Sequence, residues 1–227
     1  MKRDLLPANG EILQYLQDLG FQDLYLESLE GTVDAADIRD GESSLEAVGK
    51  RASVCSACRL HKTRSSVVFG SGNPEADLMF IGEGPGAEED RQGLPFVGRA
   101  GDLLTRIIQA IDLTRDDVYI ANIVKCRPPR NRDPLAEEAE ACSGFLKQQI
   151  ELVKPRVIVA LGRVAAQRLL GSDQALGRMR GQWYEVHGVP TRVTYHPAAL
   201  LRDASYKRPT WQDMKLVKER LASGQGA

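Results

Sequence analysis

The stretch Arg156-Val157-Ile158-Val159-Ala160-Leu161-Gly162 contains five consecutive apolar residues between an arginine and a glycine. A short run rich in β-branched side chains and ended by glycine indicates a strand that is buried on both faces. Three further runs have this character, at residues 77–82, 118–124 and 191–196. Helical patterns separate the four runs, at residues 100–111, 135–153 and 163–170. This alternation predicts an α/β fold, a three-layer sandwich around a central four-stranded parallel sheet.

The loops after these strands are where an open α/β sheet binds its ligands. They cover residues 82–96, 125–134 and 196–202, together with the segment that follows Gly162. Three of the four contain unusual residues: a glycine-rich acidic run, a cysteine beside arginines and prolines, and a histidine followed by proline. We therefore expect the chemistry of this protein at that edge of the sheet.

Charge is divided unevenly along the 227 residues. Residues 1–48 hold 3 Lys and Arg against 11 Asp and Glu, a net charge of -8, whereas residues 49–227 hold 27 against 20, a net charge of +7. The basic part suits a polyanion, although many proteins that never meet DNA carry a similar surplus. Apolar spacing over residues 11–30 and the polar linker after them predict an acidic helical extension over 1–44 and one larger domain over 45–227.

Composition places the chain among globular proteins, with 42% hydrophobic and 27% charged residues. No apolar stretch approaches the roughly 20 residues of a membrane helix, and the first residues lack the apolar core of a signal peptide. We expect a cytoplasmic monomer with no membrane partner.

The four cysteines suggest a metal site, because a cytoplasmic protein rarely keeps structural disulfides. They form a Cys55-x2-Cys58 pair, followed by Cys126 and Cys142. Four thiolates can hold a tetrahedral zinc ion or a [4Fe-4S] cluster. The open second pair is unlike a zinc knuckle and favours the cluster modestly, while four unrelated buried thiols are a further reading.

Three motifs occur in order along the chain. They are Gly82-Glu83-Gly84-Pro85-Gly86-Ala87-Glu88-Glu89-Asp90, the run from Asn122 through Cys126-Arg127-Pro128-Pro129 to Asn131-Arg132, and His196-Pro197-Ala198-Ala199-Leu200-Leu201-Arg202. With the cysteines, they resemble the motifs of family 4 uracil-DNA glycosylases, the thermostable iron–sulfur type, over about residues 52–221. The resemblance implies removal of uracil from DNA, with free uracil as product. It also implies a [4Fe-4S] cluster bound by Cys55, Cys58, Cys126 and Cys142.

The resemblance implies a pocket for a uracil that has been flipped out of the DNA. The Asn122 amide is expected to accept a hydrogen bond from uracil N3–H and donate one to O4, a pattern that cytosine reverses. Phe96 is expected to stack on the base, Glu89 to lie near C5, and Gly84 to let the backbone approach the nucleotide. Without the motifs, Asn122 would be read as a turn residue, Phe96 as a core residue and Glu89 as a surface residue.

Two residues are expected to stabilise the charges that develop as the glycosidic bond breaks. His196 is expected to donate a hydrogen bond to uracil O2. Glu83 is expected to orient the attacking water or to support the positive charge on the sugar, and the sequence leaves both roles open. The other histidines, His61 and His187, are expected to be structural or exposed to solvent, His187 in a probable hairpin.

Residues around the pocket are expected to contact the DNA. Leu200 and Leu201 are candidates to fill the gap that the flipped base leaves, with ordinary loop packing as the alternative. Phosphate contacts are expected from Lys125, Arg127, Arg130, Arg132 and Arg202, and a solvated basic loop is the competing explanation.

Rival functions remain open from the residues alone. A non-catalytic DNA-binding protein with a redox-sensing cluster would need the basic loops but not Glu83 together with His196. A mismatch glycosylase acting on thymine or on deaminated purines would use the same scaffold. A sister family that is trapped covalently on DNA has Gln at the position of Gly84, and family 5 enzymes lack the acid at Glu83, so ordinary turnover of uracil is the better match.

Overall fold

A six-stranded sheet forms the centre of the computed structural model, which describes residues 44–223. Residues 1–43, which include the predicted acidic extension, and residues 224–227 lie outside the described part of the chain. The strands follow the spatial order β1-β3-β2-β4-β6-β5. Their bounds are β1 Ser71–Gly72, β2 Leu78–Gly82, β3 Val118–Asn122, β4 Val157–Leu161, β5 Trp183–Val186 and β6 Val189–Thr194.

The four predicted strands are β2, β3, β4 and β6, and they are all parallel. Leu78 of β2 lies opposite Val118 of β3 on one side and Val157 of β4 on the other. The sequence analysis missed the edge strand β1 and gave no bounds for the edge strand β5, although the hairpin expected at His187 implies it. Both edge strands are antiparallel to their neighbours. A strand of two residues has no detectable periodicity, and β5 carries half-exposed side chains that break the apolar pattern.

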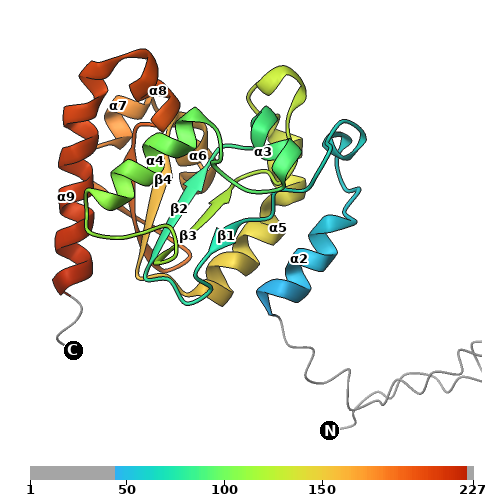
Figure 1. Cartoon of the computed structure of the whole chain (residues 1–227), viewed down its shortest axis with the longest axis horizontal. Helices are drawn as coiled ribbons and strands as arrows, with labels where there is room; N and C mark the ends of the chain where they lie inside the picture. The colour runs from blue at the N-terminus through green and yellow to red at the C-terminus, as the bar shows by residue number, and fades with distance from the viewer. Residues whose placement is uncertain (1–43, 224–227) are drawn as a thin grey trace, which may run out of the picture. The chain divides into compact units, whose positions relative to one another are not determined.

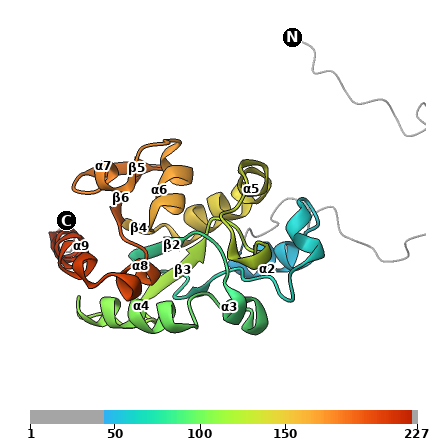
Figure 2. The ribbon, with the colours of Figure 1, turned by 90° about the horizontal axis from the view of Figure 1, so that it is seen from above.

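Helices cover both faces of the sheet, as Figures 1 and 2 show. In β2, Leu78 and Phe80 pack with side chains of α4 and α9, whereas Met79 and Ile81 pack with those of α5 and α6. This alternation along one strand produces the predicted three layers. The α-helices are α2 Leu45–Ser53, α3 Ala87–Gln92, α4 Arg99–Gln109, α5 Ala136–Val153, α6 Arg163–Leu170, α7 Leu176–Met179, α8 Pro197–Arg202 and α9 Lys207–Ser223. Short 3₁₀ turns occur at η1 Arg59–Lys62, η2 Pro129–Asn131 and η3 Ala204–Tyr206.

The three predicted helices correspond to α4, α5 and α6 within two residues at each end. The β5–β6 connection is the predicted hairpin, because His187 and Gly188 both have positive φ, at 49° and 78°. Two such residues in succession are typical of a tight hairpin turn. His187 is exposed in that turn. Among residues 44–223, no helix combines the length and the apolar character needed to cross a bilayer.

Candidate active site

A cleft of about 940 Å³ opens at the carboxyl ends of the parallel strands. Gly82 and Asn122 are the last residues of β2 and β3, and His196 follows β6 by two residues. The cleft brings together most of the predicted site residues from separate loops, namely Glu83, Gly84, Glu89, Phe96, Asn122, Arg132, His196 and Arg202. The predicted residues therefore lie together at this edge of the sheet.

The side chains of Asn122 and Phe96 both lie directly against Gly82. A Cβ atom on Gly82 would lie 2.4 Å from Asn122 Oδ1 and 2.6 Å from Phe96 Cζ, so only glycine fits at this position. Asn122 is 2% exposed, and within residues 44–223 no group forms a hydrogen bond with its side-chain amide. The amide is thus held in the wall of the cleft with its donor and acceptor unused by the described protein.

The backbone of Phe96 is fixed in an uncommon conformation, with φ at 53°. Arg115 holds it by donating from Nη1 to the Phe96 carbonyl at 3.2 Å and from Nη2 to the Pro95 carbonyl at 2.9 Å. Gly101 packs directly against the same carbonyl, where a Cβ atom would lie only 1.9 Å from the oxygen. These contacts preset the position of the ring before any ligand arrives.

His196 begins helix α8 as its N-cap residue. Its Nδ1 accepts a hydrogen bond from Ala198 N at 3.1 Å, which leaves the proton of the neutral ring on Nε2. Burial, with a smaller effect of the nearby Arg202, lowers the pKa of His196 to about 4, although Glu89 opposes the shift. At neutral pH the imidazole is therefore uncharged and presents an Nε2–H donor.

Glu83 is a partly buried carboxyl in the loop after β2. Burial, together with the Asp133 carboxyl and against the opposing effect of Arg163, raises the pKa of Glu83 to about 7. The group is therefore close to half ionised at neutral pH, which is suited to proton exchange with water or substrate.

Glu89 lines the cleft and also stabilises the loop that carries Phe96. Its Oε1 accepts hydrogen bonds from Val97 N at 3.1 Å and Gly98 N at 3.2 Å. Gly98 is the N-cap residue of α4. One carboxylate oxygen thus anchors the start of α4, which the sequence did not indicate.

The four cysteines line one small hollow, to which Arg64 and Lys125 also contribute. Arg64 Nη1 donates to Cys126 Sγ at 3.1 Å. Burial raises the pKa of the Cys126 thiol, and Arg64 opposes the rise. None of the four forms a disulfide.

The geometry of this hollow bears on the choice of metal. Within the described residues, no three His, Cys, Asp or Glu side chains are grouped as ligands of a single ion. A four-iron cluster is larger than one ion and spreads its thiolate ligands more widely, so four cysteines around a hollow with two cations fit such a cluster.

Comparison with known proteins agrees with this geometry. Residues 69–215 match the family model of the uracil DNA glycosylase superfamily. A type-4 uracil-DNA glycosylase of Archaeoglobus fulgidus is 44% identical over 78% of this chain and 92% of its own length, and one of Thermotoga maritima is 45% identical over 78% and 94%. A type-5 uracil-DNA glycosylase of Pyrobaculum aerophilum is 34% identical over 68% of this chain and 75% of its own.

The chain belongs to the type-4 uracil-DNA glycosylase family. The predicted family is thereby confirmed.

Two expectations for this type-4 family member need correction. Lys125 is 2% exposed, and its Nζ donates to Asn122 O at 2.8 Å and to Gln149 Oε1 at 2.5 Å, so it is not available to a phosphate. Leu200 is 3% exposed and packs in the interior, whereas Leu201 is 45% exposed. Of the two, only Leu201 is accessible, because successive residues of the α8 helix point in different directions and Leu200 faces the core.

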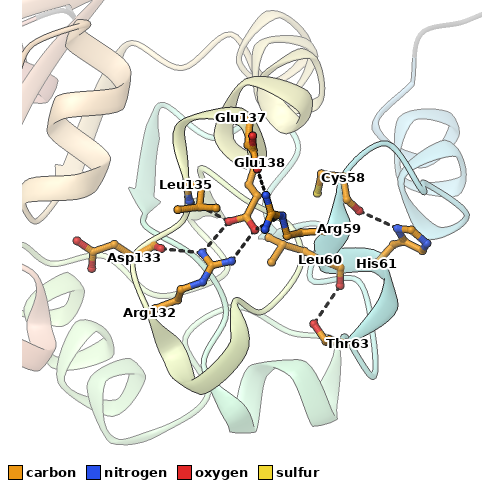
Figure 3. Close-up of polar contacts among 10 residues, drawn as sticks. All are labelled: Cys58, Arg59, Leu60, His61, Thr63, Arg132, Asp133, Leu135, Glu137 and Glu138. Carbon is orange, nitrogen blue, oxygen red and sulfur yellow. Dashed lines mark hydrogen bonds and ion pairs between the residues drawn. The ribbon is translucent and has the colours of Figure 1, made fainter.

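Arg132 is also not a free cation, because it forms an ion pair with buried Glu138, as Figure 3 shows. Its Nη1 and Nη2 donate to Glu138 Oε2 at 2.8 Å and Oε1 at 2.6 Å. Arg132 holds the pKa of Glu138 below its usual range. Arg127 donates to Asn131 Oδ1 at 2.8 Å, and Arg130 is exposed. The arginines of the predicted basic run therefore differ: Arg132 is held in an ion pair, whereas Arg130 is exposed to solvent.

Glu138 connects this loop to the segment of the first cysteine pair. It accepts from Leu135 N at 2.8 Å and lies 3.8 Å from Arg59 Nε, while Arg59 also pairs with Glu137 (Figure 3). His61 Nδ1 lies 2.7 Å from the Cys58 carbonyl, which agrees with the structural role expected for it.

The sequence analysis missed four residues that line the cleft, Asp133, Arg163, Tyr195 and Tyr206. The rings of Tyr195 and Tyr206 stack at 4.3 Å, and the Arg180 guanidinium lies 4.4 Å from the centre of the Tyr195 ring. Tyr195 directly precedes His196, which was an available signal. Nothing in the sequence pairs Asp133 with Arg163, because they come from different loops.

Proposed function

We propose that this type-4 family member flips uracil out of DNA and hydrolyses its N-glycosidic bond, leaving an abasic site and free uracil. The observation that carries the proposal is the meeting of the Asn122 amide, the Phe96 ring and the neutral His196 imidazole around one cleft. Such an excision requires a group that recognises the edge of the base, a surface on which the base stacks, and a hydrogen-bond donor for the departing base.

Recognition of uracil rests on Asn122. Its amide oxygen accepts from N3–H and its nitrogen donates to O4, and this orientation leaves both groups unpaired when cytosine enters. An unpaired buried polar group costs about 1–3 kcal/mol, so two of them reject cytosine. Phe96 stacks on the base, a contact worth about 1–3 kcal/mol, and Glu89 stands near C5, where it disfavours the thymine methyl. Gly84 lets the backbone approach the nucleotide.

His196 stabilises the departing base. Its Nε2–H donates to uracil O2, where negative charge develops as the bond to the sugar breaks. A neutral donor suits this role, because the His196 ring stabilises the charge on uracil O2 through a hydrogen bond and does not have to transfer its proton to the base. The low pKa of His196 supports the assignment over the whole physiological pH range.

Glu83 acts on the opposite side of the bond. In its ionised form, it orients and activates the attacking water and opposes the positive charge that develops on the sugar. Its partial burial favours this role, since a carboxylate in a less polar setting attracts a positive charge more strongly than one in water.

The DNA backbone is bound by cations at the rim of the cleft. Arg127, Arg130 and Arg202 contact phosphates, and Arg132 does so only to the extent that its pair with Glu138 allows. Leu201 enters the gap that the flipped base leaves. The bound DNA is single- or double-stranded, and the protein acts as a monomer in the cytoplasm, where its thiols remain reduced.

Cys55, Cys58, Cys126 and Cys142 hold a [4Fe-4S] cluster. When bound, the cluster ties together three segments of the chain and serves chiefly to maintain the structure. Arg64 and Lys125 offset the negative charge of the thiolates. Iron analysis of purified protein tests this: about four irons per chain and an absorption band near roughly 400 nm are expected. One zinc ion in protein that stays colourless after anaerobic reconstitution would exclude the cluster.

The glycosylase activity is tested with oligonucleotides that contain one uracil, single-stranded and paired with guanine. Release of free uracil together with an alkali-labile abasic site is the expected result. Matched oligonucleotides with thymine, hypoxanthine or cytosine at the same position should be cleaved far more slowly. Tight DNA binding without release of any base, over a range of salt concentrations, would replace the proposal with a non-catalytic binding function.

A further inference from the structure

Three charged groups meet on one side of the cleft. Glu83 follows β2, Asp133 lies in the loop after β3, and Arg163 begins α6 directly after β4. Since β3, β2 and β4 are adjacent parallel strands in that order, the loops at their carboxyl ends lie side by side. Asp133 and Arg163 therefore flank Glu83 from its two neighbouring loops.

Asp133 and Arg163 form an ion pair, with Arg163 Nη2 lying 2.5 Å from Asp133 Oδ2. The other terminal nitrogen of Arg163 donates to Gln167 Oε1 at 3.0 Å, one helical turn further along α6. About half of each charged side chain is exposed, so the pair gains little for the stability of the fold. Because the ion pair lines the cleft beside the Glu83 carboxyl, its charges act on the ionisation of that carboxyl.

The loop that carries Asp133 is held rigidly. Arg132 donates from Nη1 to the Asp133 carbonyl at 2.9 Å and uses both terminal nitrogens to bind the fully buried Glu138. In Figure 3, the Asp133 carboxylate points away from this clamp. The backbone of Asp133 is thus fixed by Arg132, while its carboxylate remains available to Arg163. A charge that is held in place in this way can act on a neighbouring group from a constant position.

Glu83 is that neighbouring group. It lines the cleft together with both members of the Asp133–Arg163 ion pair. After burial, the charges of Asp133 and Arg163 have the largest effects on the pKa of Glu83, and they act in opposite directions. The other ionisable residues that line the cleft are Glu89, Arg132, Tyr195, His196, Arg202, Asp203 and Tyr206. The largest effects on the Glu83 pKa come from burial, Asp133 and Arg163.

We propose that the Asp133–Arg163 pair is a positioning pair that sets the pH range over which Glu83 is ionised, and hence the pH range of base excision. The inference rests on the catalytic role of Glu83 in the proposed function. The negative charge of Asp133 delays the ionisation of Glu83 as the pH rises, because two nearby carboxyls resist carrying two negative charges. Arg163 limits this effect by neutralising Asp133 and attracting the Glu83 carboxylate.

The direction in which each substitution moves the pH profile depends on the charge that it removes. Excision requires ionised Glu83, so the rate rises as the pH rises through the Glu83 transition. Asp133→Asn removes the neighbouring negative charge and moves the rise to lower pH. Arg163→Gln removes the positive charge and moves the rise to higher pH. The two substitutions act in opposite directions, which a general loss of structure would not produce.

The experiment measures single-turnover uracil release at saturating enzyme from about pH 5 to about pH 9. For Asp133→Asn, we expect the midpoint of the rising limb about one pH unit lower than in the wild type, and a rate roughly fivefold higher at about pH 6. For Arg163→Gln, we expect the midpoint to move upward. Asp173→Asn, an exposed carboxylate outside the cleft, makes the same charge change and should leave the profile unchanged.

A second measurement needs no activity. The carbon-13 signal of the Glu83 carboxyl, assigned by its absence in Glu83→Gln, should titrate at lower pH in Asp133→Asn than in the wild type. Wild-type protein that releases no uracil would refute the proposed function, while this titration would still test the pair. Active variants whose pH profiles and carboxyl titrations coincide with the wild type would overturn the inference alone.

Discussion

The rings of Phe96 and His196 lie 5.5 Å apart, centroid to centroid, with their planes tilted by 32°. One ring is fixed by a backbone with positive φ and the other by the start of a helix, so neither depends on a ligand for its position. A flat base that stacks on Phe96 is thereby brought beside the Nε2–H of His196. If the proposed roles hold, recognition and bond cleavage share one preformed slot, and the following predictions test those roles.

Replacing His196 with alanine should lower the single-turnover rate of uracil release by about 10²–10³, the usual effect of deleting one oxyanion donor. Because His196 also caps α8, His196→Asn serves as the matched control, since asparagine is a good N-cap residue. Both variants should lose rate to a similar extent and keep their affinity for DNA. Weaker DNA binding with an unchanged chemical step would make His196 a phosphate contact instead.

Replacing Asn122 with alanine should sharply reduce uracil release, because the edge of the base then has no partner. Asn122→Asp should also be slow on uracil and should gain some activity on cytosine, since a protonated carboxyl offers a different donor pattern. Release of both bases from matched oligonucleotides is the measurement. Equal uracil rates for the wild type and Asn122→Ala would remove this residue from the site.

Replacing Gly82 with alanine should reduce uracil release without loss of the fold. The new methyl group would overlap with Asn122 Oδ1 and Phe96 Cζ and displace both. Gly144→Ala is the control, because a Cβ atom on Gly144 meets nothing within 4 Å. The two variants should show similar thermal unfolding and iron content but different rates. If Gly82→Ala excises uracil as fast as the wild type, the pocket is not formed by these two side chains.

Deleting residues 1–43 tests whether the acidic segment competes with DNA for the basic domain. The cut must precede α2, because Val48 is fully buried and removal of residues 1–48 would damage the core. Competition predicts tighter DNA binding after deletion, with a gain that shrinks as salt screens charges beyond a Debye length of about 8 Å. Identical binding of the truncated and full-length proteins at low salt would leave a passive segment or a docking site for another protein.

The sequence predicted the four parallel strands because each is a short, continuous apolar run, and it predicted the three helices between them from their periodicity. It missed β1 and gave no bounds for β5, because an edge strand has only one neighbour and needs no such apolar pattern. The division of the chain into an extension over 1–44 and a domain from 45 stays a prediction.

A residue of the site could be predicted where a motif of its own loop marks it, but not where its surroundings depend on contacts with other segments. Glu83, Asn122 and His196 were predicted because each lies at or just after the end of a strand within a motif, and all three line the cleft. Lys125 and Leu200 were assigned to the DNA by the same reasoning, and this was wrong because burial depends on how a loop folds back on the core. Asp133 and Arg163 were missed for a related reason, since their pairing exists only after β3 and β4 have taken their places on either side of β2.

The edges of the sheet have a consequence for how the protein behaves at high concentration. β1 offers only the two residues Ser71 and Gly72, too few for another chain to add a stable strand. At the other edge, Arg220 covers the Trp183 ring at 4.6 Å and places a positive charge beside β5. Short or charged edges discourage strand addition between molecules, so this sheet is protected against the growth of fibrils from either side.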